Sequence, residues 1–170
     1  MAGGYLTDDE YSFVTSVVPT LCVDVLPRFT DREGQPFLLI KRLDYADRPG
    51  WCTVGGRVRF DEPIADAAAR HIRATLGPDV RWTDPDWARP DLVIDFKREA
   101  DLATPHDPRK HSISLEWVVD FEGRPIASDE AEEIAMFPLE SLPAAHEFAF
   151  GLGEVLPRMA AGAGHRSLTG

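Results

Sequence analysis

The spacing of apolar residues alternates along the chain between a helical and a strand pattern, and the first element that it predicts is a short helix over residues 9–16. Thr7 or Asp8 precedes this segment as a cap, because a side-chain oxygen there can accept from a free backbone N–H group. Pro19 follows and ends the helix. The apolar contacts expected of this helix are Tyr11, Phe13 and Val14.

A second and stronger helix is predicted over residues 63–76. Pro63 suits the first turn of a helix, and Gly77 followed by Pro78 suits its end. Apolar residues that recur every four positions should face a sheet; they are Ile64, Ala68, Ile72 and Leu76. The stripe beside them consists of Ala67, Arg70, His71, Ala74 and Thr75.

Strand patterns cover much of the remaining chain. Residues 20–42 predict a hairpin whose two strands are joined by the turn "DREGQP". A short strand, "CTVGGRV", breaks at Gly55 and Gly56, and two more strands are predicted over residues 91–97 and 111–121. In the last strand apolar and mostly polar residues alternate, so one face should be core and the other partly polar. The mostly polar positions are Ser112, Ser114, Glu116, Val118 and Asp120.

The carboxyl-terminal part predicts an acidic loop, a short strand and a turn over residues 128–143. Residues 145–160 predict a closing helix that contains Gly151 and Gly153, and residues 161–170 a flexible tail. Mixed strands with few helices predict an α/β (α+β) fold, a layered α/β/α sandwich with a mixed sheet. The whole forms a single domain over residues 1–160.

Composition limits the class of protein. The 170 residues are 44% hydrophobic and 28% charged, which fits one domain with an ordinary core. The amino-terminal residues include Asp8 and Asp9 and lack the basic-then-apolar order of a secretory signal, so we expect a cytoplasmic protein. Cys22 and Cys52 lack metal-ligand spacing and are expected to be buried thiols.

The net charge is −11, from 18 Lys and Arg against 29 Asp and Glu. This charge opposes binding to nucleic acid and to anionic membrane surfaces. A small phosphorylated ligand is still compatible with it, because a few arginines can make one cleft positive. The locally basic stretch of His106, Arg109, Lys110 and His111 is compatible both with a lid over a phosphate site and with a solvated loop.

The glycine turn before the second helix is typical of a phosphate site. Such a turn directs backbone N–H groups and the positive end of the helix dipole toward a bound anion. A stripe of carboxylates on the helix would then hold Mg²⁺ against the phosphate. His71, Ala74 and Thr75 stand on that stripe instead, so the phosphate half of the pattern is present and the metal half is not.

The spacing of Gly56, Glu62, Arg70 and Gly77 resembles the Nudix box, G-x5-E-x7-R-E-U-x-E-E-x-G-U. The box is degenerate, because its later glutamates are replaced by His71, Ala74 and Thr75. Within the Nudix hydrolase superfamily the chain is most similar to the GDP-mannose mannosyl hydrolase branch, through "LTDDEYSFVTSVVPTLCVDVL", "LLIKR" and "VGGRV…DE". The resemblance implies a Nudix-like α/β/α sandwich.

The resemblance also implies roles for single residues. Arg42 and Arg57 match arginines that contact the diphosphate, and Asp24 matches a residue that contacts the sugar. Arg70 matches the arginine of the box. Because the amino-terminal region through which that branch forms dimers is well matched here, the resemblance implies a homodimer.

The metal ligands of that branch are matched less well. Thr75 stands where the branch keeps a metal-binding glutamate on the helix. Glu130 and Ala131 align with a further metal ligand and an adjacent catalytic histidine. Glu130 can ligate a cation such as Mg²⁺, whereas Ala131 cannot act as a base.

The residues themselves leave several roles open. Arg57 directly follows the turn, where a guanidinium can bind phosphate oxygens in bidentate fashion. Arg70 can complete a phosphate clamp or brace the helix by pairing with Glu62 or Asp66. His71 can replace a metal ligand, act as a general base or simply pack. Side chains that could form a relocated metal site, or only acidic surface, are Glu116, Glu130, Glu132 and Glu133.

The first functional hypothesis is a divergent Nudix-family hydrolase acting on a nucleoside diphosphate sugar or a related nucleotide diphosphate. Its candidate catalytic residues are His71, Glu116 and Glu130, with Glu130 also the candidate Mg²⁺ ligand. Its candidate substrate-binding residues are Asp24, Arg42, Gly55, Gly56, Arg57, Arg70 and His111. The second hypothesis is a catalytically inactive Nudix-like domain that binds a nucleotide or sugar ligand, or a protein partner.

Overall fold

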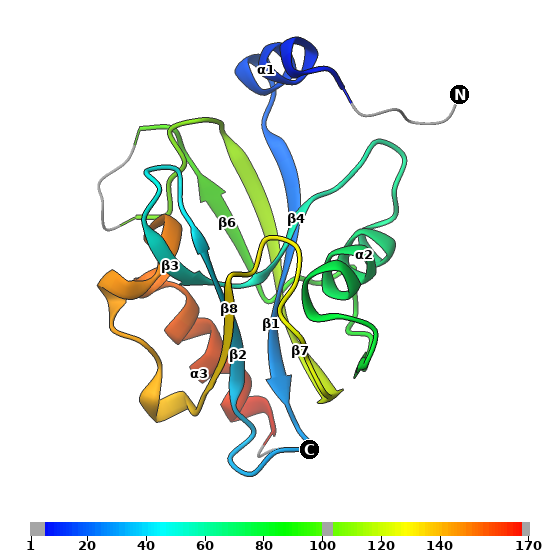
Figure 1. Ribbon diagram of the computed structural model, residues 1–170, viewed down its shortest axis with the longest axis vertical. Coiled ribbons are helices and arrows are strands. Elements are labelled where there is room, and N and C mark those ends of the chain that lie inside the picture. The colour runs from blue at the N-terminus through cyan, green and yellow to red at the C-terminus, as the bar shows by residue number, and fades with distance from the viewer. Residues whose placement is uncertain (1–5, 100–103, 168–170) are drawn as a thin grey trace.

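The structure is a computed structural model that describes residues 6–99 and 104–167, and a mixed sheet occupies its centre (Figure 1). The strands are β1 (Thr20–Phe29), β2 (Phe37–Leu43), β3 (Pro49–Cys52), β4 (Val54–Arg57), β5 (Val80–Trp82), β6 (Leu92–Phe96), β7 (Ser112–Gly123) and β8 (Glu133–Phe137). The helices are α1 (Asp8–Val17), α2 (Ile64–Leu76) and α3 (Leu156–Ser167), with 3-10 turns η1 (Leu139–Ser141), η2 (Ala145–Glu147) and η3 (Ala149–Glu154).

The sheet is organised around β1 and β7, which run parallel and stay in register from Thr20 opposite Ser112 to Phe29 opposite Phe121. The main strand order is β3-β2-β1-β7-β5, while β4 pairs with β1, β6 with β7 and β8 with β2. All of these further pairings are antiparallel. With α2 on one side of the strands and α3 on the other (Figure 1), the predicted layered α/β fold is confirmed.

Helix α2 forms as the sequence predicts. Pro63 is its N-cap and Gly77, at φ 80°, its C-cap. Gly77 adopts this left-handed backbone conformation without the penalty that a Cβ would bring. The residues buried against the sheet are Ala67, Ala68, Ile72, Thr75 and Leu76. Among the described residues, no helix is long and apolar enough to cross a bilayer.

The polar face of β7 is a first correction to the sequence prediction. Ser112, Ser114 and Glu116 are 5%, 1% and 1% exposed, so they lie inside the protein. Further along, Trp117, at 1% exposure, belongs to the core on the opposite face. Near its start, β7 is therefore more buried on its polar face than on its apolar face, where Ile113 and Leu115 are only half-buried.

Helix α1 is a second correction. Its capping box is present, since the Thr7 side chain accepts from Glu10 N–H while the Glu10 carboxylate accepts from Thr7 N–H. None of its residues is buried, however, and Phe13 is 68% exposed. The predicted packing of Phe13 and Val14 against this chain is therefore wrong.

The predicted closing helix is a third correction. The segment is broken at Phe150 and Gly151, which have φ values of 56° and 73°. Only after this kink does α3 begin at Leu156. A Cβ on Gly151 would collide with the backbone of Thr104 and Pro105, so the break is tied to the loop that precedes β7.

Both cysteines are buried free thiols. Burial, the largest cause, raises the pKa of Cys22 to about 12 and also raises the pKa of Cys52. Neither thiol is therefore ionised near neutral pH.

A substitution at Gly55 tests how closely β4 approaches β1. A Cβ at this position would meet Val23 O and would lie 2.6 Å from the Cα of Asp24, which is backbone that cannot swing aside. We expect Gly55→Ala to lower the free energy of unfolding by at least about 2 kcal/mol, measured by urea denaturation. Gly162→Ala is the matched control, because nothing lies within 4 Å of its Cβ position in α3. Equal stability of the two variants would contradict the described strand contact.

Candidate functional site

Arg57 ends β4 and lines a pocket of about 280 Å³. Seven of the predicted site residues line this central pocket: Asp24, Arg42, Gly55, Gly56, Arg57, His71 and Glu130. The other lining residues are Cys22, Phe96, Asp107, Arg109, Lys110, Ser112, Ser114, Asp129 and Phe150. The pocket is thus assembled from β1, β2, β4, β6, β7 and α2, with the segments that lead into β7, β8 and α3.

Gly56 lets α2 approach β4. Its φ is 157°, and a Cβ added there would lie 2.7 Å from Cε1 of His71. The imidazole therefore lies directly against the backbone of the glycine turn. Nε2 of His71 is 3.2 Å from both the Arg57 carbonyl oxygen and Nη1 of Arg70. Burial, the largest cause, lowers the pKa of His71, so the ring is neutral near pH 7.

Arg70 braces the turn between β4 and α2. Its guanidinium donates to Glu62 over 2.8 Å and 2.7 Å and to the Arg57 carbonyl over 3.0 Å. Glu62 also accepts from Arg59 N–H over 2.8 Å. The hydrogen bonds from Arg70, the largest cause, lower the pKa of Glu62 to about 2. Arg70 is committed to these contacts and does not line the pocket.

Two carboxyl groups lie close together at the pocket: Asp24 lines it and is half-buried, whereas Glu116 is 1% exposed and is not among the lining residues. Asp24 and Glu116 are opposite one another on β1 and β7. Burial is the main reason why the pKa of Asp24 is raised. Burial, and then the negative charge of Asp24, raise the pKa of Glu116 well above its ordinary value.

A hydroxyl group connects the two acids. Ser114 Oγ donates to Asp24 Oδ2, and Ser114 is also hydrogen-bonded to Glu116. Burial and the charge of Asp24, which raise the pKa of Glu116, outweigh the hydrogen bonds from Ser114 and Thr53, which lower it. Glu116 Oε2 is nevertheless buried without a hydrogen-bond partner among the described residues.

At the opposite wall, Arg42 forms an ion pair with Glu130. Burial, the largest cause, raises the pKa of Glu130, while the charge of Arg42 opposes the shift. The Arg42 guanidinium carbon also lies 5.7 Å from the ring centre of Phe150. Phe150 reaches this position through the left-handed kink before α3. The kink was not predicted, because the local sequence pattern is that of a helix.

Positive charge enters the pocket from Arg57 and Lys110. Neither side chain forms an ion pair with any residue in the described parts of the chain. The guanidinium carbon of Arg57 lies 4.7 Å from the ring centre of Tyr11, so α1 holds it in place. By contrast, Arg109 donates to Asp107 over 2.9 Å and is neutralised.

The basic stretch before β7 is divided among different roles. His106 is buried, its Nδ1 donates to Thr104 O over 2.9 Å, and its Nε2 contacts the Tyr45 hydroxyl. His111 lies outside the pocket with Nε2 2.8 Å from Asp95 Oδ1. Lys110 is the member of this stretch that brings an unpaired charge to the pocket.

The residues present do not fit a Mg²⁺ site. No group of three or more His, Cys, Asp or Glu side chains suited to a metal ion occurs in residues 6–99 and 104–167. On α2, Ala74 has no ligand atom and Thr75 offers a neutral, buried hydroxyl. Glu130 is already paired with Arg42. Mg²⁺ prefers an octahedral oxygen set that includes carboxylates, and these residues do not supply one.

A family model described as "Domain of unknown function (DUF4916)" matches residues 1–164. The chain belongs to the DUF4916 family. No curated protein matches this DUF4916 chain. Solved structures do resemble it.

One similar structure, from Jonesia denitrificans, is described as a possible asymmetric diadenosine tetraphosphate hydrolase. It is 26% identical with a TM-score of 0.74, over 85% of this chain and 94% of the other. A MutT Nudix hydrolase from Burkholderia pseudomallei is 22% identical with a TM-score of 0.62, over 84% and 98% of the two chains.

The Nudix domain of NrtR from Shewanella oneidensis, solved with ADP-ribose, is 16% identical with a TM-score of 0.57, over 93% and 99% of the chains. The predicted Nudix-like fold of this DUF4916 protein is thereby confirmed.

The buried acid Glu116 makes stability depend on pH. Its pKa is higher in the folded state than its ordinary value of 4.5, so the native state binds the proton more tightly and stability falls as pH rises above that value. Glu116→Gln removes the titrating group but keeps an acceptor. We expect the melting temperature of the variant to exceed that of the wild type by a margin that grows from about pH 5 to about pH 8.

Glu122→Gln, at the exposed end of the same strand, is the control for this measurement. Its margin over the wild type should not grow with pH. A constant loss of stability in Glu116→Gln at every pH would contradict the raised pKa of the buried Glu116.

Proposed function

We propose that this chain binds a nucleoside diphosphate sugar or a related nucleotide diphosphate in the central pocket and hydrolyses it as a divergent Nudix hydrolase. The observation that carries the proposal is the pair of unneutralised cations, Arg57 and Lys110, at a concave site in a chain of net charge −11. Guanidinium and ammonium groups are the side chains that bind phosphate oxygens best. Their concentration here favours a diphosphate over a neutral ligand.

The acidic floor supports a sugar or another hydroxylated group beside the diphosphate. Asp24 lines the pocket, and one of its oxygens accepts from Ser114. Its remaining lone pairs can accept from ligand hydroxyls. This arrangement agrees with the sugar-contacting role that the likeness to the GDP-mannose mannosyl hydrolase branch implies for Asp24.

In this proposal the Nudix box is degenerate and His71 takes the part of a general base. The imidazole lines the pocket next to Arg57 and is neutral near pH 7, so it can accept a proton from an attacking water. Arg42 and Glu130 shape the wall opposite. Glu116 lies beneath the lining and keeps Asp24 within a proton-sharing network, so we assign it a positioning role.

The alternative is a domain that binds the same ligand without turnover. It is favoured by Ala131, which stands where the resembling branch has its catalytic histidine, and by the Arg42–Glu130 ion pair, which occupies the carboxylate that a metal would need. Both hypotheses require diphosphate binding. They differ only in whether products appear.

Arg57→Gln tests the diphosphate site. Calorimetric titration with GDP-mannose and ADP-ribose should show affinity at least about tenfold weaker than in the wild type, because charge-assisted hydrogen bonds to phosphate are lost. Arg81→Gln, whose side chain is 76% exposed on β5, is the matched control and should bind as the wild type does. Unchanged affinity in Arg57→Gln would contradict the proposed site.

Assays for phosphate and sugar release from the same mixtures separate the two hypotheses. Release by the wild type that falls about 10²-fold or more in His71→Gln supports the hydrolase with His71 as base. Binding without release from any ligand refutes the hydrolase and leaves the binding domain.

We further propose that the chain forms a homodimer through the outer face of α1. Phe13 and Val17 lie one helical turn apart and are 68% and 60% exposed, which is unusual for apolar side chains on a surface helix. We expect light scattering to give a dimer mass for the wild type and a monomer mass for Phe13→Glu. Thermal melting of the same samples shows whether the variant still folds, and a monomeric wild type would contradict the proposal.

A further inference from the structure

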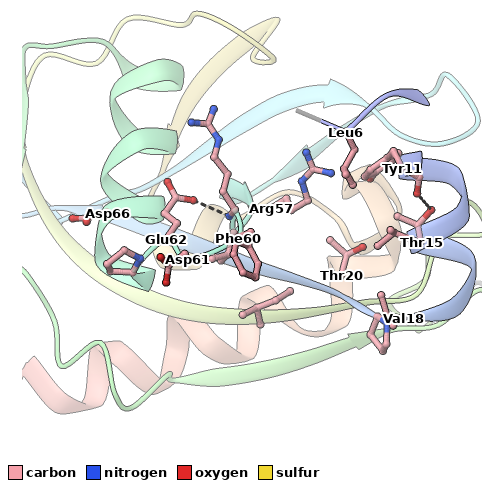
Figure 2. Close-up of a pocket in the computed structure, with 16 residues that line it drawn as sticks. Leu6, Tyr11, Thr15, Val18, Thr20, Arg57, Phe60, Asp61, Glu62 and Asp66 are labelled. Atoms are coloured by element: carbon pink, nitrogen blue, oxygen red, sulfur yellow. Dashed lines mark hydrogen bonds between the residues drawn. The ribbon is translucent and has the colours of Figure 1, made fainter. Parts of the chain in front are cut away.

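A second recess lies beside the central pocket, between α1 and the turn that enters α2. We call it the α1 groove; its volume is about 770 Å³. Figure 2 shows Phe60 and Glu62 on one side, Tyr11 and Thr15 of α1 with its C-cap Val18 on the other, and Thr20 between them. A recess of this size is in the usual range for sites that take small organic ligands.

Phe60 is the most conspicuous side chain of the α1 groove, because it is an aromatic residue with 96% exposure. Its backbone is not loose. Glu62 N–H donates to Arg59 O over 3.2 Å, Arg59 N–H donates to the Glu62 carboxylate, and Arg70 holds that carboxylate. An exposed aromatic ring on a braced turn offers a preorganised face for stacking.

Arg57 connects the α1 groove to the central pocket, since it lines both. The ring of Tyr11 fixes its guanidinium at this junction. A ligand that spans the two recesses therefore passes its middle portion across a fixed positive charge. The two ends of such a ligand meet different surroundings: Phe60 and apolar α1 side chains on one side, and the acidic floor at Asp24 on the other.

We propose that the α1 groove is the base subsite, in which the aromatic base of a nucleoside diphosphate compound stacks on Phe60 while its diphosphate lies at Arg57. This inference rests on the proposed function and adds the direction of the ligand, with the group beyond the diphosphate toward Asp24. A nucleobase fits the α1 groove because it has an apolar face for Phe60 and polar edges for Thr20 and Asp61. The negative charge that follows it complements Arg57.

The inference is tested by titrating the full chain with inorganic pyrophosphate and with ADP, GDP, UDP and CDP. In the wild type the nucleoside diphosphates should bind more tightly than pyrophosphate. Phe60→Ala should weaken their binding by about tenfold, as removal of a stacked base's aromatic partner does, and should leave pyrophosphate binding unchanged. Phe60→Tyr keeps an aromatic ring and should bind the nucleoside diphosphates with the affinity of the wild type.

Val93→Ala is the matched control, since Val93 is a 55% exposed apolar residue on β6 outside both recesses. Phe60 is almost fully exposed, so its loss leaves the core intact. Equal affinity of the wild type and Phe60→Ala for every nucleoside diphosphate overturns the base subsite. A Phe60→Ala variant that changes only the oligomeric mass also overturns it, in favour of a protein contact. If pyrophosphate does not bind, or if its binding does not depend on Arg57, the proposed function is refuted instead.

Discussion

The parallel pairing of β1 with β7 is the contact on which the rest of the site depends. It brings Asp24 and Glu116 opposite one another although they are far apart in the sequence. Glu116 is 1% exposed and Asp24 is half-buried beside it, so the two acids cannot both carry a charge at low cost. Burial therefore raises the pKa values of both acids, and the hydrogen bonds from Ser114 offset only part of this rise.

The other walls of the pocket are built outward from this pair of strands. On the edge of β1 away from β7, β4 pairs with β1 so closely that only glycine fits at Gly55. Gly56 then admits the His71 ring, and the next residue, Arg57, is directed to the boundary of the two recesses. The Glu62–Arg70 brace keeps the following turn in shape. A negatively charged chain thereby presents local positive charge at one concave place.

Local sequence patterns predict the elements that are determined by residues near one another in the sequence. Helix α2 follows from its apolar period, Pro63 and Gly77, and the hairpin of β1 and β2 follows from its turn. Patterns could not show that the polar side of β7 is buried, because this depends on which layers cover it. Nor could they show the break at Phe150, since the collision that Gly151 avoids is with Thr104 from a distant segment.

The site was predictable to a similar extent. The glycine turn and box spacing pointed to Arg57 and His71, and the structure places both at the pocket. Spacing alone left the role of Arg70 open, and the structure shows the brace to Glu62. The exposure of Phe60 was not predictable, because the sequence does not show whether the rest of the fold buries an apolar side chain in a turn.

A fold shared with Nudix hydrolases does not by itself assign a reaction, because function resides in the side chains of the site. Here those side chains favour a ligand with an aromatic base, a diphosphate and a hydroxylated end. The most direct test is a crystal structure of the chain with a saturating nucleoside diphosphate. We predict phosphates within hydrogen-bonding distance of Arg57 and Lys110 and the base against Phe60. Ligand bound elsewhere, with both recesses empty, would contradict this assignment.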